Sequence, residues 1–380
     1  MTKEKNGYFK DALLLIPRDI SDWQLKEALA LLDTAGYRLY DYVRYRRVSR
    51  SRLLSQAKLR EVAEKASELQ GKDGARIIVY DELRPREYFR IIREAKVETI
   101  DRTMLILEIF ALHAGSREAK LQIELARLKH QLPVIKEAIR LAKLRELPGF
   151  LGPGGYAVDA YYRYMVSRIA RIRRELERLR KRRELERSKR RSAGLPHVAI
   201  VGYASVGKTT LFNSLTHESK SIGPEYFTTL SPKVKAISHN GFRFALVDTV
   251  GFISDIPVEI IEAFHSTLEE AATADIVLYV VDVSEREDVL VEKLGEGIDV
   301  LRRIGVVDKP MIIAANKIDL IGNEEELKHR LELISGLVSA LYPGIRDVVP
   351  VSAKNKVGLD RLLCRLSTLL KDMERYMFYA

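Results

Sequence analysis

The residues with the clearest chemical potential form a glycine-rich loop in the second half of the chain. It reads G-x-x-x-x-G-K-T from Gly202 to Thr209, between the apolar run His197–Val201 and a helical pattern. Backbone N–H groups in such a loop surround phosphate oxygens, and the following helix N-terminus adds partial positive charge. The pattern predicts a nucleoside triphosphate site in which Lys208 reaches the β- and γ-phosphates. A ligand-free strand-to-helix turn is the alternative.

Oxygen-bearing side chains near this loop indicate a magnesium ion. We expect the Thr209 hydroxyl to bind Mg²⁺ directly and Asp248, after the apolar run Phe244–Val247, to bind it through water. Asp248 opens a D-x-x-G segment that ends at Gly251, whose N–H is expected to meet the γ-phosphate. D-x-x-G alone is a weak signal. Its position 40 residues after Lys208 supports this interpretation.

A further motif selects the base. N-K-I-D, from Asn316 to Asp319, follows the apolar run Met311–Ala315, and the Asp319 carboxylate can accept hydrogen bonds from the N1–H and 2-amino groups of guanine. Adenine lacks these donors, so the carboxylate would be left unpaired beside it. S-A-K, from Ser352 to Lys354, is expected to pack on the base. Together the motifs predict a switch that hydrolyses GTP to GDP; use of ATP as well stays open.

The residue after Gly251 predicts the rate of hydrolysis. Many switch GTPases place a glutamine there to orient the attacking water, and this chain has Phe252. A phenyl ring cannot polarise water, so we expect slow intrinsic hydrolysis. A stimulating partner that supplies charge and order is worth about 10³–10⁵ in rate. Among the residues of these motifs, Lys208 and Gly251 are the predicted catalytic residues, and no glutamine is available to join them.

Composition limits the class of protein. The chain has 380 residues, enough for two or three domains, and a formal net charge of +11. Its one cysteine, Cys364, excludes an internal disulfide and is expected in the core, within the apolar-periodic helix Leu359–Leu370. No apolar run reaches the roughly 18 residues that a membrane span needs. These features predict a cytoplasmic protein with no membrane partner.

The positive charge is concentrated in one segment. Between Arg163 and Arg191 there are 14 Lys/Arg and four Asp/Glu residues. Such a basic stripe is typical of a surface that binds a polyanion. The alternative is a solvated helix face whose charges pair with acidic residues elsewhere.

The first hundred residues alternate short apolar strands with helical patterns, which predicts a small βαβ-type sheet. The expected strands are Asp11–Ile16, Tyr37–Val43, Ala75–Tyr80 and Val97–Ile100, and the expected helices are Asp22–Asp33, Leu53–Leu69 and Pro85–Glu94. Farther along, Asn240-Gly241 separates two strand patterns, Lys233–His239 and Phe242–Val247, and predicts an antiparallel hairpin.

Two equal apolar seams predict a long antiparallel helical hairpin around the Gly/Pro-rich turn Gly149–Gly155. Both seams repeat at spacings of four and three: Leu121, Leu125, Leu128, Leu132, Ile135, Ile139 and Ala142, then Val158, Tyr162, Met165, Ile169, Ile172, Leu176 and Leu179. The fold class is α/β, a P-loop GTPase domain with a mixed, mostly parallel sheet. The expected domains are a small α/β subdomain (1–102), the hairpin (103–190), a linker (191–195) and the GTPase domain (196–372).

The chain resembles the HflX family of ribosome-associated GTPases, in an archaeal-like form without a carboxy-terminal extension. Besides the nucleotide motifs, the resemblance rests on segments of the amino-terminal half and of the region around the first switch. These are Tyr80–Pro85, Ile100–Thr103, Leu105–Phe110, Arg117–Ala126, Gly152–Gly154 and Phe227–Leu230. It covers about residues 10–370.

The resemblance implies a residue-level assignment of the site. Thr229 becomes the second Mg²⁺ hydroxyl, with Thr228 as its close competitor, alongside Thr209 and Asp248, and joins Lys208 and Gly251 as a predicted catalytic residue. The nucleotide-binding residues are Gly202, Tyr203, Ala204, Ser205, Val206, Gly207, Lys208, Thr209, Thr210, Phe227, Thr228, Thr229, Leu230, Ser231, Asp248, Thr249, Val250, Gly251, Asn316, Lys317, Asp319, Ser352, Ala353 and Lys354. The cofactor is Mg²⁺, with GTP as substrate and GDP as product.

The resemblance also implies partners, the large (50S) ribosomal subunit and its RNA, with no DNA expected. It implies a role in ribosome splitting, recycling or biogenesis, among which the sequence does not choose. Two departures from the family pattern stand out: the segment after Gly155 lacks the usual acidic-polar run, and Ser205 replaces an asparagine that helps bind potassium in cation-stimulated GTPases. The alternative function is a GTP-gated protein whose basic hairpin binds another protein or an anionic membrane surface.

Overall fold

A computed structural model describes residues 9–49, 52–144, 146, 155–192, 195–217, 233–255, 257, 260–261 and 265–379. The chain forms two compact units. Unit 1 comprises Met1–Leu112 and Lys120–Leu176, and unit 2 comprises His113–Ala119 and Glu177–Ala380.

Unit 1 contains a four-stranded sheet in which every pair of neighbouring strands is parallel. Its order is β2-β1-β3-β4. The strands are β1 (Lys10–Pro17), β2 (Tyr37–Tyr45), β3 (Arg76–Val79) and β4 (Glu98–Asp101). The predicted βαβ-type sheet is therefore confirmed.

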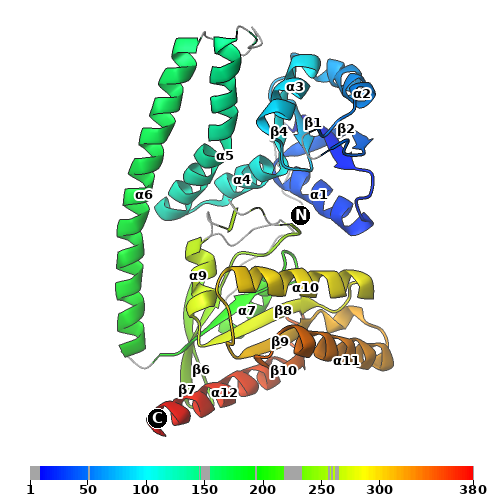
Figure 1. The fold of residues 1–380 in the computed structure, drawn as a ribbon. Helices are drawn as coiled ribbons and strands as arrows, with labels where there is room; N and C mark the ends of the chain where they lie inside the picture. Colours follow the sequence, from blue (N-terminus) through cyan, green and yellow to red (C-terminus); the bar gives the residue numbers. More distant parts are fainter. Residues whose placement is uncertain are drawn as a thin grey trace. The chain divides into compact units, whose positions relative to one another are not determined.

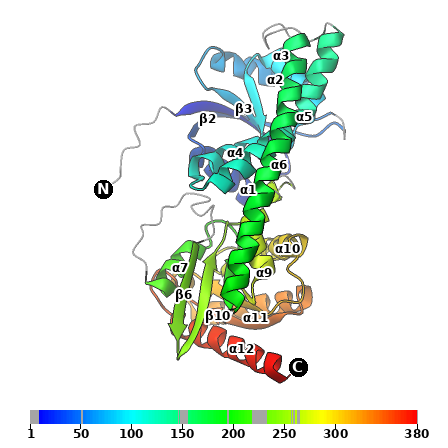
Figure 2. The same cartoon turned by 90° about the vertical axis from the view of Figure 1, so that its left-hand side faces the viewer.

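Helices cover both faces of this sheet (Figures 1 and 2). They are α1 (Asp22–Thr34), α2 (Gln56–Ala66), η1 (Ser67–Leu69), α3 (Pro85–Ala95) and α4 (Arg102–His113). In both views α2 and α3 lie on one side of the sheet, and α1 and α4 lie on the other. Leu13, Leu15 and Ile77 of the sheet pack with Val62 of α2 and Ile91 of α3 in one apolar cluster.

Two helices of this unit differ from what the sequence predicted, and each difference has a local reason. The helix expected from Leu53 begins at Gln56, because the Ser55 side chain accepts a hydrogen bond from the Lys58 N–H and caps the helix. Helix α4 was not predicted. Almost every side chain from Arg102 to Phe110 is buried, so this helix has no polar face to produce a 3.6-residue pattern.

The helical hairpin consists of α5 (Arg117–Lys143) and α6 (Gly155–Ser192), which run antiparallel and side by side in both views. Met165 and Ile172, both from the predicted seam, are fully buried. The Arg168 guanidinium and the Glu124 carboxylate pair across the helices at 2.6 Å. The hairpin prediction is confirmed, while residues 149–154 of its turn lie outside the described residues.

Unit 2 contains a six-stranded sheet of order β10-β9-β8-β5-β7-β6. The strands are β5 (His197–Val201), β6 (Lys233–His239), β7 (Phe242–Asp248), β8 (Ile276–Asp282), β9 (Met311–Asn316) and β10 (Ile345–Pro350). Neighbouring strands are parallel except for β6 and β7, which pair antiparallel. Asn240 and Gly241 both have positive φ in the two-residue turn, so the predicted hairpin is confirmed.

Five helices and a short 3₁₀ turn are described within the GTPase part of unit 2. They are α7 (Lys208–Thr216), α9 (His265–Thr273), α10 (Glu287–Arg303), η3 (Ile318–Leu320), α11 (Glu324–Leu341) and α12 (Leu359–Tyr379). In Figures 1 and 2, α9, α10 and α11 lie on one face of the sheet and α7 on the other. The predicted fold class, a P-loop GTPase sheet preceded by a small α/β region and a helical hairpin, is confirmed.

Helix α12 overturns the expectation that Cys364 is buried. Leu362, Leu366 and Leu370 face the core, with at most 1% of each residue exposed. Cys364 lies two residues after Leu362, about 200° around the helix, and is exposed.

Among the described residues, no helix combines the length and apolar character required to cross a membrane.

Candidate functional site

The phosphate-loop sequence joins the end of β5 to the start of α7, as predicted. Gly202 and Gly207 have φ of 144° and 96°, a region that favours glycine. A Cβ on Gly202 would lie 2.3 Å from the Val280 carbonyl oxygen, and one on Gly207 would lie 2.4 Å from the Asn316 side-chain nitrogen. Both glycines are therefore required by close approach as well as by backbone conformation.

Lys208 is buried at the first position of α7. Its ammonium donates a 2.5 Å hydrogen bond to the carbonyl oxygen of Tyr203, within the same loop. Burial lowers the pKa of Lys208 to about 8, against an opposing effect of the Asp248 carboxylate. A poorly hydrated ammonium at a helix N-terminus suits a polyphosphate, because the phosphate oxygens replace the missing solvation.

The predicted metal-binding side chains of Thr209 and Asp248 lie together. The Thr209 hydroxyl donates a 3.0 Å hydrogen bond to a carboxylate oxygen of Asp248, the last residue of β7. Asp248 is fully buried. Hydroxyl and carboxylate oxygens are the ligand types that Mg²⁺ prefers, so the two side chains fit this ion.

The D-x-x-G segment lies against the phosphate loop. The Phe252 N–H donates to the Gly202 carbonyl at 3.0 Å, and the Ala204 N–H donates to the Phe252 carbonyl at 2.6 Å. The Phe252 ring, 1% exposed, meets the Tyr203 ring edge-on with centroids 6.4 Å apart. A Cβ on Gly251 would lie 2.8 Å from the Lys208 ammonium, so the end of the D-x-x-G segment lies immediately beside the phosphate loop.

The guanine-recognition sequence lies at the end of β9 and contacts the phosphate loop through Asn316. The Asn316 amide donates to the Val206 carbonyl at 2.8 Å, and its oxygen accepts from the Ala353 N–H at 2.9 Å. The Ser352 hydroxyl donates to the Asp319 carboxylate at 2.5 Å. Three motifs that are distant in sequence therefore meet at the carboxyl edge of one sheet.

Other predicted site residues differ in how far they are exposed to solvent. Val206, Thr249, Val250, Ser352 and Ala353 are buried, whereas Lys354 and Ser205 are exposed. The predicted first-switch residues Phe227, Thr228, Thr229, Leu230 and Ser231 lie outside the described residues.

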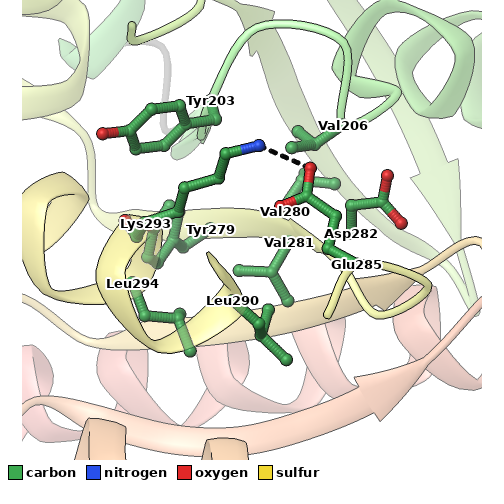
Figure 3. Close-up of a pocket in the computed structure, with 10 residues that line it drawn as sticks. All are labelled: Tyr203, Val206, Tyr279, Val280, Val281, Asp282, Glu285, Leu290, Lys293 and Leu294. Atoms are coloured by element: carbon green, nitrogen blue, oxygen red, sulfur yellow. Dashed lines mark hydrogen bonds and ion pairs between the residues drawn. The ribbon is translucent and has the colours of Figure 1, made fainter. Parts of the chain in front are cut away.

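Sequence reasoning did not identify a group of charged side chains behind the phosphate loop, around a small cavity shown in Figure 3. Lys293 of α10 pairs with Glu285 at 2.5 Å and lies 5.6 Å from the centre of the Tyr203 ring. Asp282, the last residue of β8, pairs with Lys317 at 2.5 Å. An acidic residue ending the strand next to the guanine-recognition strand was the available signal, since β8 and β9 are parallel neighbours.

Comparison with known proteins agrees with this geometry. Residues 197–317 match a family described as 50S ribosome-binding GTPase, residues 113–190 the middle region of GTP-binding GTPases, and residues 22–111 their N-terminal region. GTPase HflX of Hyperthermus butylicus is 66% identical over 366 residues, which cover 96% of this chain and 97% of that protein. The chain belongs to the HflX family of GTPases. The predicted family and the predicted GTPase activity are thus confirmed.

Other HflX relatives and solved structures agree. GTPase HflX of Saccharolobus solfataricus is 39% identical, with 96% of this chain and 99% of that protein covered. A GTP-binding protein from Sulfolobus solfataricus, solved in complex with GDP, has 34% identity and a TM-score of 0.53, with 96% of this chain and 99% of that chain covered. A second structure, of SsGBP with GDP, has 35% identity and a TM-score of 0.55 over 95% of this chain and 99% of that chain. This HflX protein is accordingly a GTP-binding GTPase.

Proposed function

We propose that this HflX GTPase binds GTP at the carboxyl edge of the unit 2 sheet and that the nucleotide state controls its association with the large ribosomal subunit. The hydrogen bond from Asn316 to Val206 carries the site assignment, because it joins the guanine-recognition sequence to the phosphate loop. The proposed nucleotide-binding residues are those assigned above, with Asp319 recognising guanine and Lys208 the β- and γ-phosphates.

Magnesium is the proposed cofactor, held by the Thr209 hydroxyl, by Asp248 through water and by Thr229 of the first switch. When bound, Mg²⁺ neutralises developing negative charge on the phosphates. Lys208 and the Gly251 N–H stabilise the γ-phosphate during hydrolysis. Phe252 is buried against Tyr203 and has no polar group, which supports slow intrinsic hydrolysis accelerated by a partner.

The basic arm α6 supports a polyanionic partner. Arg171, Arg174, Arg178 and Lys181 are exposed and recur at spacings of three and four. That spacing places them on one helix face, opposite the buried seam residue Ile172. A four-residue basic stripe fits the phosphates of ribosomal RNA, and the family description of residues 197–317 as a 50S ribosome-binding GTPase agrees.

We propose functional boundaries at 1–102, 103–190 and 196–372, and a cytoplasmic role with ribosomes in splitting, recycling or biogenesis.

Turnover of GTP measured with and without purified large subunits, over a salt series, tests this function. We expect stimulation by the subunits that weakens steeply with salt. Engagement of six phosphates would cost about 10³ in affinity between 50 and 200 mM salt, by analogy with duplex DNA. Replacing Arg171, Arg174 and Arg178 by serine should weaken subunit binding without changing GTP affinity, and the same change at exposed Arg286 should leave binding unchanged.

The alternative is a GTP-gated protein whose basic arm binds another protein or an anionic membrane surface. Co-sedimentation with ribosomal particles or with anionic liposomes separates the two functions. Salt-insensitive binding to the subunit, or binding to liposomes alone, would contradict the ribosomal proposal.

A further inference from the structure

Asp282 connects the strand before the guanine-recognition sequence to that sequence itself. It ends β8 directly beside Asn316, which ends β9, and the Val283 N–H donates to the Asn316 carbonyl at 3.0 Å. The carboxylate of Asp282 is almost completely buried, with 7% of the residue exposed. One of its oxygens lies 2.5 Å from the Lys317 ammonium.

The second oxygen of Asp282 is held by Ser284. This oxygen accepts hydrogen bonds from the Ser284 N–H at 3.0 Å and from the Ser284 hydroxyl at 2.6 Å. The carboxylate is therefore held by Ser284 through one oxygen and by Lys317 through the other. Because both oxygens are used, rotation of the Asp282 side chain would break at least one of these contacts.

The loop that carries Asp282 is fixed in turn by α11. Arg330 donates to the Val283 carbonyl at 2.8 Å and also to the Glu285 carbonyl. The Arg330 side chain is only 12% exposed and pairs with Glu326 at 2.8 Å on its own helix. The backbone on both sides of Ser284 is consequently anchored to a neighbouring helix.

Lys317 has a restricted backbone as well. It adopts a left-handed conformation, with φ of 68° and ψ of 32°, between β9 and η3. Its side chain is 30% exposed, so the aliphatic stem remains accessible while the ammonium pairs with buried Asp282. Two residues later, Asp319 is held by Ser352. Lys317 and Asp319 thus have separate anchors, Asp282 and Ser352.

We propose that Asp282 is a positioning residue for the guanine site, acting through Lys317. This inference rests on the proposed nucleotide site. Asp282 holds the Lys317 ammonium at 2.5 Å, which leaves the methylene groups of this lysine to contact one face of the purine ring. Asp319 recognises the edge of the same ring, and the two roles are chemically separate.

A second ion pair lies beside Asp282. Glu285 and Lys293 form the next ion pair along the loop, and both line the cavity with Asp282 (Figure 3). Burial raises the pKa of Glu285, while Lys293 opposes that shift. Glu285 and Asp282 are therefore paired with different lysines, and the contact to Lys317 is made by Asp282.

Binding of GDP and inosine diphosphate to the full chain tests the proposal. Asp282→Asn should weaken both nucleotides by the same factor, about tenfold, because losing a charge-assisted hydrogen bond releases the lysine stem but leaves recognition of the ring edge intact. Asp319→Asn should instead reduce the preference for GDP over inosine diphosphate, since the 2-amino group distinguishes these bases. Asp288→Asn is the matched control, because Asp288 is exposed and pairs with Arg286 on the surface.

A double-mutant cycle separates positioning from a general structural role. Lys317→Met keeps an aliphatic stem and removes the ammonium. In that background Asp282→Asn should change GDP affinity less than about twofold, because its partner is already absent. An undiminished tenfold loss there would overturn the proposal, as would wild-type affinity of the single variant Asp282→Asn.

Different outcomes test the nucleotide site and the role of Asp282. If the wild-type chain binds no GDP, or Asp319→Asn keeps its guanine preference, the site assignment falls and the role of Asp282 falls with it. If both of those results are as expected but Asp282→Asn binds GDP normally, only the role of Asp282 is excluded. Thermal unfolding of each variant without nucleotide identifies any variant that fails to fold, and Asp282→Asn keeps the side-chain shape to limit that outcome.

Discussion

The Asn316 side-chain amide donates a 2.8 Å hydrogen bond to the carbonyl oxygen of Val206, 110 residues earlier in the chain. Its oxygen accepts from the Ala353 N–H, so one buried side chain connects three loops. A buried amide with both ends engaged fixes the relative positions of these loops. The proposed base and phosphate sites are thereby joined into one surface.

Removing this amide should weaken both the fold and the site. Asn316→Ala leaves the Val206 carbonyl and the Ala353 N–H without their side-chain partner, at a cost of about 1–3 kcal/mol in unfolding free energy. GDP affinity should fall at least about tenfold as the loops separate. Urea unfolding and calorimetric titration measure the two effects. Asn355→Ala, at an exposed position of the loop that carries Ala353, is the control and should leave both quantities unchanged.

Nucleotide affinity should fall as the pH rises above about 8. The pKa of buried Lys208 is lowered to about 8, so the nucleotide-free protein loses this positive charge well below the ordinary value of 10.5. Phosphate binding favours the ammonium, and the affinity loss approaches tenfold per pH unit above that pKa.

The contribution of Lys208 to folding stability changes with pH in the opposite direction. Because the unfolded chain binds the extra proton between pH 8 and 10.5, the contribution of Lys208 to stability rises over that range.

Proton uptake measured by calorimetry in buffers of different ionisation enthalpy checks this prediction. Binding of GDP at pH 9 should take up nearly one proton, and binding at pH 6 almost none from this lysine. Lys328→Met removes an exposed lysine on α11 and should keep the wild-type profile. A flat affinity between pH 7 and 10 would refute the role given to Lys208.

Magnesium dependence should reside in the Thr209 hydroxyl. Thr209→Ala should lower GTP turnover about 10²-fold, because the metal loses a ligand while the phosphate loop remains in place. GDP affinity measured with excess chelator should be unchanged, since no metal is then bound. Thr209→Ser restores a hydroxyl and should recover most of the activity. Equal turnover of the alanine and serine variants would argue against a metal ligand at this position.

Arg183 of α6 should contribute more to stability than its exposed neighbours. It lies 2.9 Å from Glu118 of α5 and 3.0 Å from Glu269 of α9, and all three side chains are mostly buried. Arg183→Met leaves two partly buried carboxylates without this cation, which should cost about 1–2 kcal/mol. Arg180→Met removes an exposed pair with Glu184 and should cost less than about 0.5 kcal/mol. Chemical denaturation of both variants gives the comparison; equal losses would mean that Arg183 has no special role.

Much of the fold was readable because local patterns and tertiary structure agree. The β6–β7 hairpin follows from Asn240-Gly241, whose positive φ angles suit a two-residue turn, and the hairpin seams follow from repeats such as Met165 and Ile172. Helix α4 was not predicted because it is buried on nearly every side and has no amphipathic period. Cys364 was misplaced because it lies in an apolar-periodic helix but not on the apolar face.

The sequence by itself determined the family, the GTPase fold class and the order of the nucleotide motifs, because these depend on glycines, charged residues and apolar spacing within short segments. Only the tertiary structure decided how the motifs meet: Asn316 on Val206, Phe252 on the phosphate loop, and Asp282 on Lys317. The physical reason is that parallel strands bring their carboxyl ends together, so residues a hundred positions apart share one edge. No local pattern records which side chain at that edge reaches which partner.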